Sequence, residues 1–218
     1  MEKIFICLAN SKKYSGRCLA GIELERDEHH KWHLPHAEQG NVRWIRPVGK
    51  GDHGSVPIPE VKHLDLLDIV AFDAGQPCPE TYQTENIHYL GTRFEKVGHL
   101  NAKPENLDQL AEHHTDLLLG NREKFVTVEE AKTLDHSIVL IKTDTPHLHL
   151  YEKGVQLRCG FQWRESQYDL PVTDIVFHLN WIDNPRLLAG KEHLYLCISL
   201  AIEMDGKHHK LVAGILGT

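Results

Sequence analysis

The stretch KIFICLANSKKYSGRCLAGIEL, residues 3–24, decides the fold class of this chain. It opens with the apolar run of residues 3–8, which is typical of a strand, and continues with the polar, turn-rich residues 10–16. A second apolar run, residues 18–24, is interrupted by Gly21, which inside a strand indicates a bulge or a bend. Two strands joined by a turn, one of them bent, predict a small curved β-barrel.

Short apolar runs broken by turn residues continue along the chain. The polar residues 25–41 lack a period and predict an exposed excursion, and two prolines in residues 75–82 exclude a central strand there. Residues 171–182 fit either a short helix or a strand, and Asp205-Gly206 between two apolar runs indicates a hairpin. The further strand candidates are residues 42–48, 66–72, 86–90, 92–97, 137–142, 147–151, 155–163, 195–202 and 210–215.

Helical signals are concentrated between the two strand-rich halves. Apolar residues recur every three or four positions after Lys103, and Pro104 suits a first turn, so we expect an acidic amphipathic helix over residues 104–119. A shorter helix begins at Thr127, which forms a capping-box pattern with Glu130. The predicted organisation is mainly β, with a first barrel in residues 1–100, a helical connector in residues 101–136 and a second barrel in residues 137–218.

Composition excludes several classes of protein. The 218 residues are 41% hydrophobic and 25% charged, which is typical of a globular chain and not of a disordered or disulfide-built one. The five cysteines are widely spaced with no CxxC pair, which indicates reduced core residues. No apolar run approaches the roughly 18 residues of a membrane span, and residues 1–10 lack signal-peptide features. We therefore expect a soluble, cytoplasmic protein with no membrane partner.

The charge is unevenly distributed. A net charge of -7 argues against indiscriminate binding to a polyanion, because such binding comes largely from lysine and arginine. Residues 1–50, however, contain nine basic against six acidic residues, whereas residues 101–136 contain four against eight. An anionic partner would bind the first of these segments.

Lys12, Lys13, Tyr14 and Arg17 form a compact basic and aromatic group after the first predicted strand. A loop that carries cations and one stacking ring suits single-stranded nucleic acid, because phosphates require positive charge and bases offer their faces to aromatic rings. The alternative interpretation is a solvated turn.

A second candidate group lies in RWIRPV, residues 43–48. Along a strand Arg43 faces one side while Trp44 and Arg46 face the other, where they would stack a base and hold its phosphate. The alternative is a tryptophan that caps the barrel with the arginine packed over it. Arg158 and Arg164, with neighbouring aromatic residues, form a similar but weaker patch in the second half.

Histidine is the compositional oddity, with 17 residues. His29, His30, His33 and His36 suggest a metal site, since imidazole is a common metal ligand, but Pro35 interrupts a helix and no second ligand pair accompanies them. A solvated loop is the simpler interpretation, so we predict no metal. No P-loop, GxGxxG, HExxH or GxSxG motif is present, and the sequence predicts neither a catalytic residue nor a cofactor.

Seven stretches resemble, in the same order, the prokaryotic family described as dual OB-containing domain. They lie between residues 3 and 216 and read KKYSGRCLAG, RWIRPV, LLDIV, PETYQTEN, QYDLPVTD, LCISL and KLVAGI. The resemblance implies two OB-like barrels in one chain, an association with bacterial conflict and antiviral loci, and nucleic-acid binding inferred from the fold. At the matching positions, the residues that would meet a ligand are Lys12, Arg17, Arg43, Trp44, Arg46 and Asn86.

Three functions follow from these observations. The first is a non-catalytic nucleic-acid-binding or sensing module for DNA or RNA, single strands favoured, that acts beside a protein effector encoded nearby. The second is a protein-interaction subunit that docks a basic partner through the acidic segment of residues 104–119. The third is a metal-dependent hydrolase that uses clustered histidine and aspartate residues.

Overall fold

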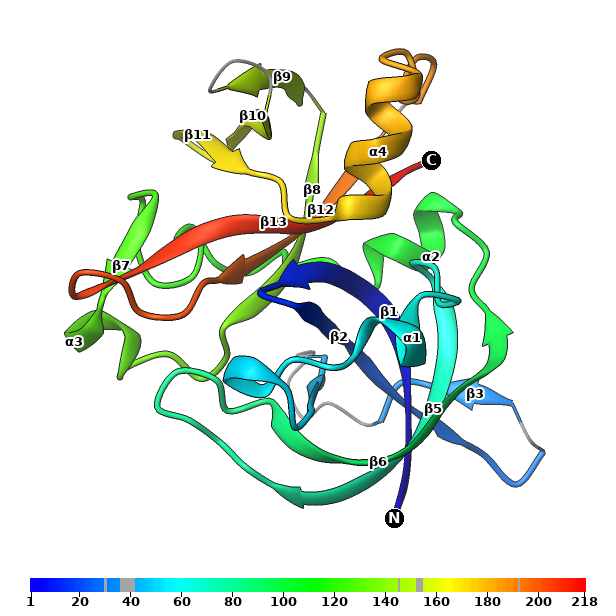
Figure 1. Ribbon diagram of the computed structural model, residues 1–218. Coiled ribbons are helices and arrows are strands. Elements are labelled where there is room, and N and C mark those ends of the chain that lie inside the picture. Colours follow the sequence, from blue (N-terminus) through cyan, green and yellow to red (C-terminus); the bar gives the residue numbers. More distant parts are fainter. Residues whose placement is uncertain (30, 36–41, 145, 152–154, 192) are drawn as a thin grey trace. The chain divides into compact units, whose positions relative to one another are not determined.

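The structure, a computed structural model, describes residues 1–29, 31–35, 42–144, 146–151, 155–191 and 193–218. The chain divides into two compact units, unit 1 (Met1–Asn101) and unit 2 (Ala102–Thr218) (Figure 1). Both consist mainly of antiparallel strands, so the predicted mainly β fold with two OB-like parts is confirmed. None of the described helices is long and apolar enough to cross a membrane.

In the described part of unit 1, five strands close a barrel. The ladder runs β1-β5-β6-β4-β2 and returns from β2 to β1, and the short β3 extends it at β2. All neighbours are antiparallel except β4 and β6, which gives the Greek-key connectivity of an OB barrel. The elements are β1 (Glu2–Lys13), β2 (Gly16–Arg26), β3 (Trp32–His33), β4 (Trp44–Val48), a short 3-10 helix (Asp52–Gly54), α1 (Ile58–Val61), β5 (Asp68–Pro77) and β6 (Asn86–His99).

The bend predicted at Gly21 is confirmed. The β1–β2 register shifts between Cys7 and Ala9, opposite Gly21, so β1 carries the extra residue of the bulge. A Cβ at Gly21 would lie 1.8 Å from the carbonyl oxygen of Ile6, so only glycine permits this approach of the two backbones. The barrel closes around a core in which Phe72 packs against Phe5 and Phe94, at centroid distances of 5.7 and 5.5 Å.

Two local predictions in unit 1 are wrong in part, and a third is confirmed. β1 continues to Lys13, which leaves only a two-residue turn where residues 10–16 predicted a longer one. β5 reaches Pro77, but its pairing with β1 ends at Asp73 and Pro77 faces β6 alone, so the prediction that residues 75–82 form no central strand is confirmed. The two strand candidates around Gly91 are one strand, β6, in which Gly91 takes a φ of +76°.

Unit 2 has an incompletely closed architecture in its described residues. One curved sheet has the order β7-β13-β12-β8 and a second the order β11-β10-β9, and an isolated bridge joins Val172 to Val212 of β13. The predicted hairpin at Asp205-Gly206 is confirmed, with φ angles of 52° and 76°. The elements are α2 (Pro104–Asp108), β7 (Phe125–Thr127), α3 (Val128–Ala131), β8 (Ile138–Thr143), β9 (His147–Tyr151), β10 (Gln156–Trp163), β11 (Ser166–Pro171), α4 (Ile175–Asp183), β12 (Leu194–Leu200) and β13 (Lys207–Gly217).

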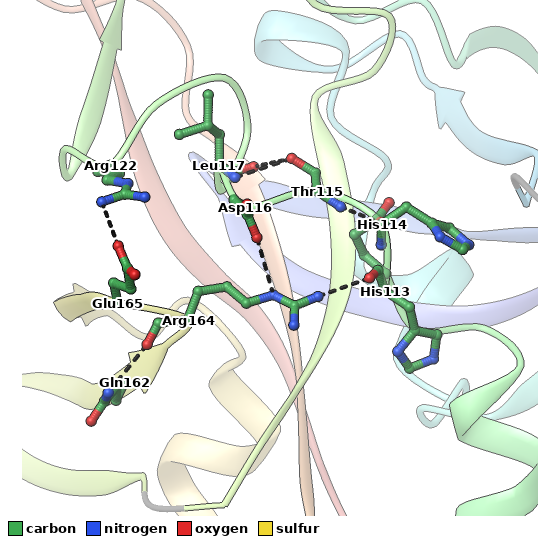
Figure 2. A network of polar contacts seen from close by, with 10 residues as sticks. His113, His114, Thr115, Asp116, Leu117, Arg122, Gln162, Arg164 and Glu165 are labelled. Carbon is green, nitrogen blue, oxygen red and sulfur yellow. Dashed lines mark hydrogen bonds and ion pairs between the residues drawn. The ribbon is translucent and has the colours of Figure 1, made fainter.

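The helix predicted over residues 104–119 is wrong beyond its first turn, because α2 ends at Asp108. The residues after α2 form a loop. Figure 2 shows that Arg164, in the turn between β10 and β11, contacts His113 and Asp116 of this loop. Its guanidinium donates to the carbonyl oxygen of His113 at 2.8 Å and lies 3.9 Å from the carboxylate of Asp116. Leu107, Leu110 and Leu118 are buried all the same, so the apolar spacing reports burial and not helix.

Two other helix signals are clearer. The capping box at Thr127 is confirmed, because its hydroxyl accepts from the Glu130 amide while the Glu130 carboxylate accepts from the Thr127 amide. The ambiguous residues 171–182 contain the end of β11 and most of α4, which begins after Asp174. The Asp174 carboxylate accepts from the backbone amide of Phe177 at 3.0 Å and caps the helix.

Candidate nucleic-acid interface

The turn between β1 and β2 carries the first group of predicted binding residues. Lys12 pairs with Arg17 and Lys13 with Gly16, which leaves Tyr14 at the turn. Tyr14 has a φ of 49°, and 54% of the residue is exposed. A two-residue turn thus brings three cations and one ring to the end of the barrel.

The loop of residues 49–56, which follows β4, packs against this turn. The ring of Tyr14 stacks on the imidazole of His53, with centroids 4.4 Å apart. Arg17 and Val56 exchange two backbone hydrogen bonds of 2.8 and 2.9 Å. A Cβ on Gly16 would lie 2.6 Å from the Val56 carbonyl oxygen, so glycine allows the close contact. We call Lys12, Lys13, Tyr14, Arg17, Lys50 and His53 the tip cluster.

The tip cluster is positive. Lys12 and Lys50 are exposed and Lys13 is half-buried. Within the residues that the structure describes, none of these three lysines has an acidic partner within ion-pair distance. The carboxylate of Asp52 lies in the same loop and accepts from the Ser15 hydroxyl at 3.4 Å. The three lysines therefore lie, at least partly exposed, in the turn that carries Tyr14 and in the loop that packs against it.

The β4 residues lie in a different environment. Only 4% of the Arg46 side chain is exposed, and its guanidinium forms a 2.9 Å ion pair with Glu85, whose side chain is 1% exposed. The backbone amide of Arg46 also donates to the Glu85 carbonyl oxygen at 2.9 Å. Trp44 and Asn86 are buried too, and Asn86 donates to the Gln83 side chain. Arg46 and Asn86 thus hold the loop between β5 and β6 in place.

Tyr82 belongs to the same buried group. Burial raises the pKa of its phenol to about 12, against the opposing influence of the Arg46 charge. The phenol is therefore neutral at physiological pH.

Arg43 is exposed but forms an ion pair. Its guanidinium lies 3.2 Å from the buried carboxylate of Glu23, which Lys3 also contacts. Glu23 is seven positions along β2 from Gly16, or roughly 20 Å at the usual rise of a strand. Arg43 therefore lies apart from the tip cluster, and of the predicted residues only Lys12, Lys13, Tyr14 and Arg17 are brought together at the turn.

The other predicted groups are dispersed. Arg158 forms a 2.7 Å ion pair with Asp169. Arg164 binds the loop that follows α2, through the carbonyl oxygen of His113 (Figure 2). His29 is exposed and His33 lies 3.9 Å from Glu25, while His30 and His36 fall outside the described residues. Among the residues placed by the structure, no group of three or more histidine, cysteine, aspartate or glutamate side chains has a metal-binding arrangement.

Sequence reasoning did not identify Lys50 and His53. Both lie in GKGDHGS, a stretch that indicates a flexible loop. The overlooked signal is the three glycines, Gly49, Gly51 and Gly54, directly after a predicted strand. The backbone amides of Gly49 and Gly51 donate to the carbonyl oxygens of Gly54 and Ser55, and these hydrogen bonds give the loop a defined shape.

No curated protein matches the chain. One similar solved structure is described as "Molecular basis for abrogation of activation of pro-inflammatory cytokines". Its sequence identity is 7% and its TM-score is 0.36, and the alignment covers 100% of this chain and 92% of that chain. A second is a murine DNA-binding protein bound with double-stranded DNA. Its sequence identity is 7% and its TM-score is 0.34, and the alignment covers 100% of this chain and 96% of that chain.

Both similarities are too weak to show a shared fold. The family comparison is specific, because the match runs over residues 3–215 and so covers nearly the whole sequence. The chain thus belongs to the family described as Dual OB-containing domain.

Proposed function

We propose that this protein binds nucleic acid, with single-stranded DNA or RNA favoured, through the tip cluster of unit 1. The observation that carries the proposal is the half-exposed stack of Tyr14 on His53 beside three lysines at the end of an OB barrel. OB barrels bind oligonucleotides on a strand face framed by the loop between their first two strands, and the tip cluster lies at that loop.

The chemistry of the tip cluster suits a single strand. His53 covers one face of the Tyr14 ring, and a residue that remains 54% exposed offers its other face to a base. A base stacked there extends an existing stack of two rings, while Lys12, Lys13 and Lys50 contact the flanking phosphates. Such stacking tolerates any base, so we expect weak sequence preference.

Few phosphate contacts are available, which limits the expected affinity and its salt dependence. Each phosphate that a cation neutralises contributes about -0.7 to the slope of log affinity against log salt for single strands. Three lysines therefore give a slope of about -2, or a roughly twentyfold loss of affinity between about 50 and 200 mM salt. The net charge of -7 further disfavours binding elsewhere on the surface.

The test is fluorescence anisotropy of the full, untagged chain with labelled single- and double-stranded DNA and RNA at both salt concentrations. For the K12A/K13A variant we expect weaker binding and only a two- to threefold salt effect, because about one phosphate contact remains. R93A is the matched control: Arg93 is an exposed cation of β6 whose ion pair with Glu95 is a surface pair of little energetic value. It should bind as the wild type does.

Equal affinities for K12A/K13A and the wild type would overturn the tip cluster as the site. Absence of binding to all four nucleic acids at low salt would overturn the function, and the acidic segment of residues 104–119 would then be the first surface to test for a protein partner.

A finer role extends this proposal: sensing of nucleic acid in a prokaryotic conflict system, beside an effector encoded nearby. The support is the family resemblance carried by the seven sequence stretches. If an effector responds to strands bound at the tip cluster, K12A/K13A should abolish protection against phage by the native locus while R93A preserves it. Full protection by K12A/K13A would contradict this role.

A further inference from the structure

Unit 2 contains a cavity that the proposed function does not use. It has a volume of about 410 Å³ and lies between the start of β9 and the turns that follow α4. That volume falls within the range of about 300–1,000 Å³ typical of small-molecule sites. Its lining includes Trp181, Pro185, Arg186, Leu188 and Lys191.

The wall formed by residues 184–191 is an ordered series of turns. The backbone amides of Leu187, Ala189 and Lys191 donate to the carbonyl oxygens of Asn184, Arg186 and Leu188, at 2.9, 2.8 and 3.2 Å. The side chain of Asn184 also accepts from the amide of Arg186 at 3.2 Å. These hydrogen bonds fix the backbone from which the two cations project.

The same wall packs against the last strand. A Cβ on Gly217 would lie 3.1 Å from Cγ of Lys191 and 3.3 Å from Cδ2 of Leu188, so both side-chain stems rest on the backbone of β13. Lys191 can therefore bury its stem and keep its ammonium group in solvent at the cavity.

The lining carries a net positive charge. Arg186 and Lys191 are exposed cations. The lining carboxylate, Asp144, has an ion-pair partner in His193 at 3.7 Å when that imidazole is protonated. Two cations on one wall suit a phosphate, since guanidinium binds its oxygens in a bidentate manner and ammonium adds a point charge.

Apart from His147, the rest of the lining consists of apolar and aromatic residues. Trp181 is half-buried and lines the cavity. Pro185 and Leu188 add apolar surface on the same side. An aromatic ring with cations nearby accommodates a planar heterocycle attached to a phosphate, because stacking and charge act on different parts of one ligand.

We propose that this cavity binds a nucleoside monophosphate group, with the base against Trp181 and the phosphate at Arg186 and Lys191. Such a group occurs as a free mononucleotide and as the 5′-phosphorylated end of a strand. The site lies wholly in unit 2 and is independent of the tip cluster of unit 1.

The test is calorimetric titration of the full chain with AMP, CMP, adenosine and inorganic phosphate. We expect both mononucleotides to bind at least tenfold more tightly than adenosine or phosphate, because adenosine lacks the charge-assisted contacts and phosphate lacks the stacking. R186A/K191A and W181L should each weaken AMP binding about tenfold or more. K132A, which removes an exposed cation of unit 2 paired with Glu129, is the control and should match the wild type.

Oligonucleotides with and without a 5′-phosphate separate the two sources of the ligand. In the K12A/K13A background a preference for the phosphorylated strand assigns the cavity to strand ends, and equal binding of both strands assigns it to free mononucleotides. A K12A/K13A protein that loses oligonucleotides but retains AMP would leave this site standing whatever becomes of the tip cluster.

Failure of the folded wild type to bind AMP and CMP would overturn the proposal. AMP binding that is unchanged in R186A/K191A would overturn it equally. Thermal unfolding of each variant ensures that only folded proteins are compared, and W181F, which retains a flat ring, should keep most of the affinity that W181L loses.

Discussion

The ring of Tyr14 lies on the imidazole of His53, with centroids 4.4 Å apart and planes inclined by 22°. Both residues have positive φ angles, 49° and 53°, in loops that are separate in sequence. A side chain in this backbone region typically costs about 1–3 kcal/mol and persists only where surrounding contacts hold it. The two-residue turn requires this φ at Tyr14, and the stack of the two rings joins the turn to the loop that carries His53.

Replacement of the stacking ring tests that role directly. Tyr14→Ala should weaken binding of single-stranded oligonucleotides by about 1–3 kcal/mol, because the accessible ring face is lost. Tyr14→Phe preserves the ring and should bind within about twofold of the wild type, since stacking needs the ring and not the hydroxyl. Anisotropy titrations of both variants provide the comparison, and equal affinity of the two would show that no base stacks there.

The buried ion pair of Arg46 and Glu85 should affect the free energy of unfolding. Arg46→Met should destabilise the fold by about 3–5 kcal/mol, because it leaves the Glu85 carboxylate buried without its cation. The double variant R46M/E85L should regain most of that loss, since an apolar pair of similar volume needs no desolvation. Urea unfolding measures both, and a single variant as stable as the wild type would contradict the assignment.

Asp68 should give the protein an acid-sensitive component of stability. Its side chain is fully buried, and although burial alone raises the pKa, hydrogen bonds from Lys96, the Asp65 backbone and His99 outweigh that effect and lower the pKa below its ordinary value of 3.8. The folded state thus binds this proton less readily than the unfolded state does. The stabilisation is therefore present above about pH 4 and lost as the pH falls through the lowered pKa.

Asp68→Asn isolates this contribution. The variant should be less stable than the wild type at pH 7 and should lose less stability between pH 5 and pH 3 in urea unfolding experiments. Parallel profiles of the two proteins across that range would refute the linkage.

Gly21 tests the closure of the barrel. Gly21→Ala places a Cβ 1.8 Å from the Ile6 carbonyl oxygen, so β1 and β2 must separate, at a cost of about 3 kcal/mol or more. Gly91→Ala is the matched control, because a Cβ at Gly91 meets no atom within 4 Å and only its φ of +76° is unfavourable, by about 1–2 kcal/mol. Thermal unfolding should rank G21A well below G91A, and the reverse order would contradict this account of the bulge.

Local patterns predicted much of the strand content. β9 has the predicted bounds of residues 147–151, and the capping box at Thr127 and the hairpin at Asp205-Gly206 are both present. Each of these signals acts over a few neighbouring residues, through the alternation of a strand, a side-chain cap or a φ preference. Such signals can be read from sequence because their physical cause is local.

What sequence reasoning missed has non-local causes. Residues 104–119 have helical spacing, yet Arg164 from a distant turn binds the His113 carbonyl oxygen and holds a loop instead. Trp44 and Arg46 share one face of a strand, as residues of a binding face would, but both are buried and the Arg46 guanidinium is paired with Glu85. Whether these residues contact nucleic acid stays a prediction that the burial does not favour.

The sequence by itself determined a mainly β chain, the bend at Gly21, the basic turn of Lys12, Lys13 and Tyr14, and the family through its ordered stretches. The tertiary structure alone decided which cations remain exposed, that His53 supports the Tyr14 ring, and that Arg186 and Lys191 border one cavity with Trp181. The reason is physical: strand and turn preferences depend on neighbours along the chain, whereas burial, ion pairing and cavity lining depend on residues that only folding brings together.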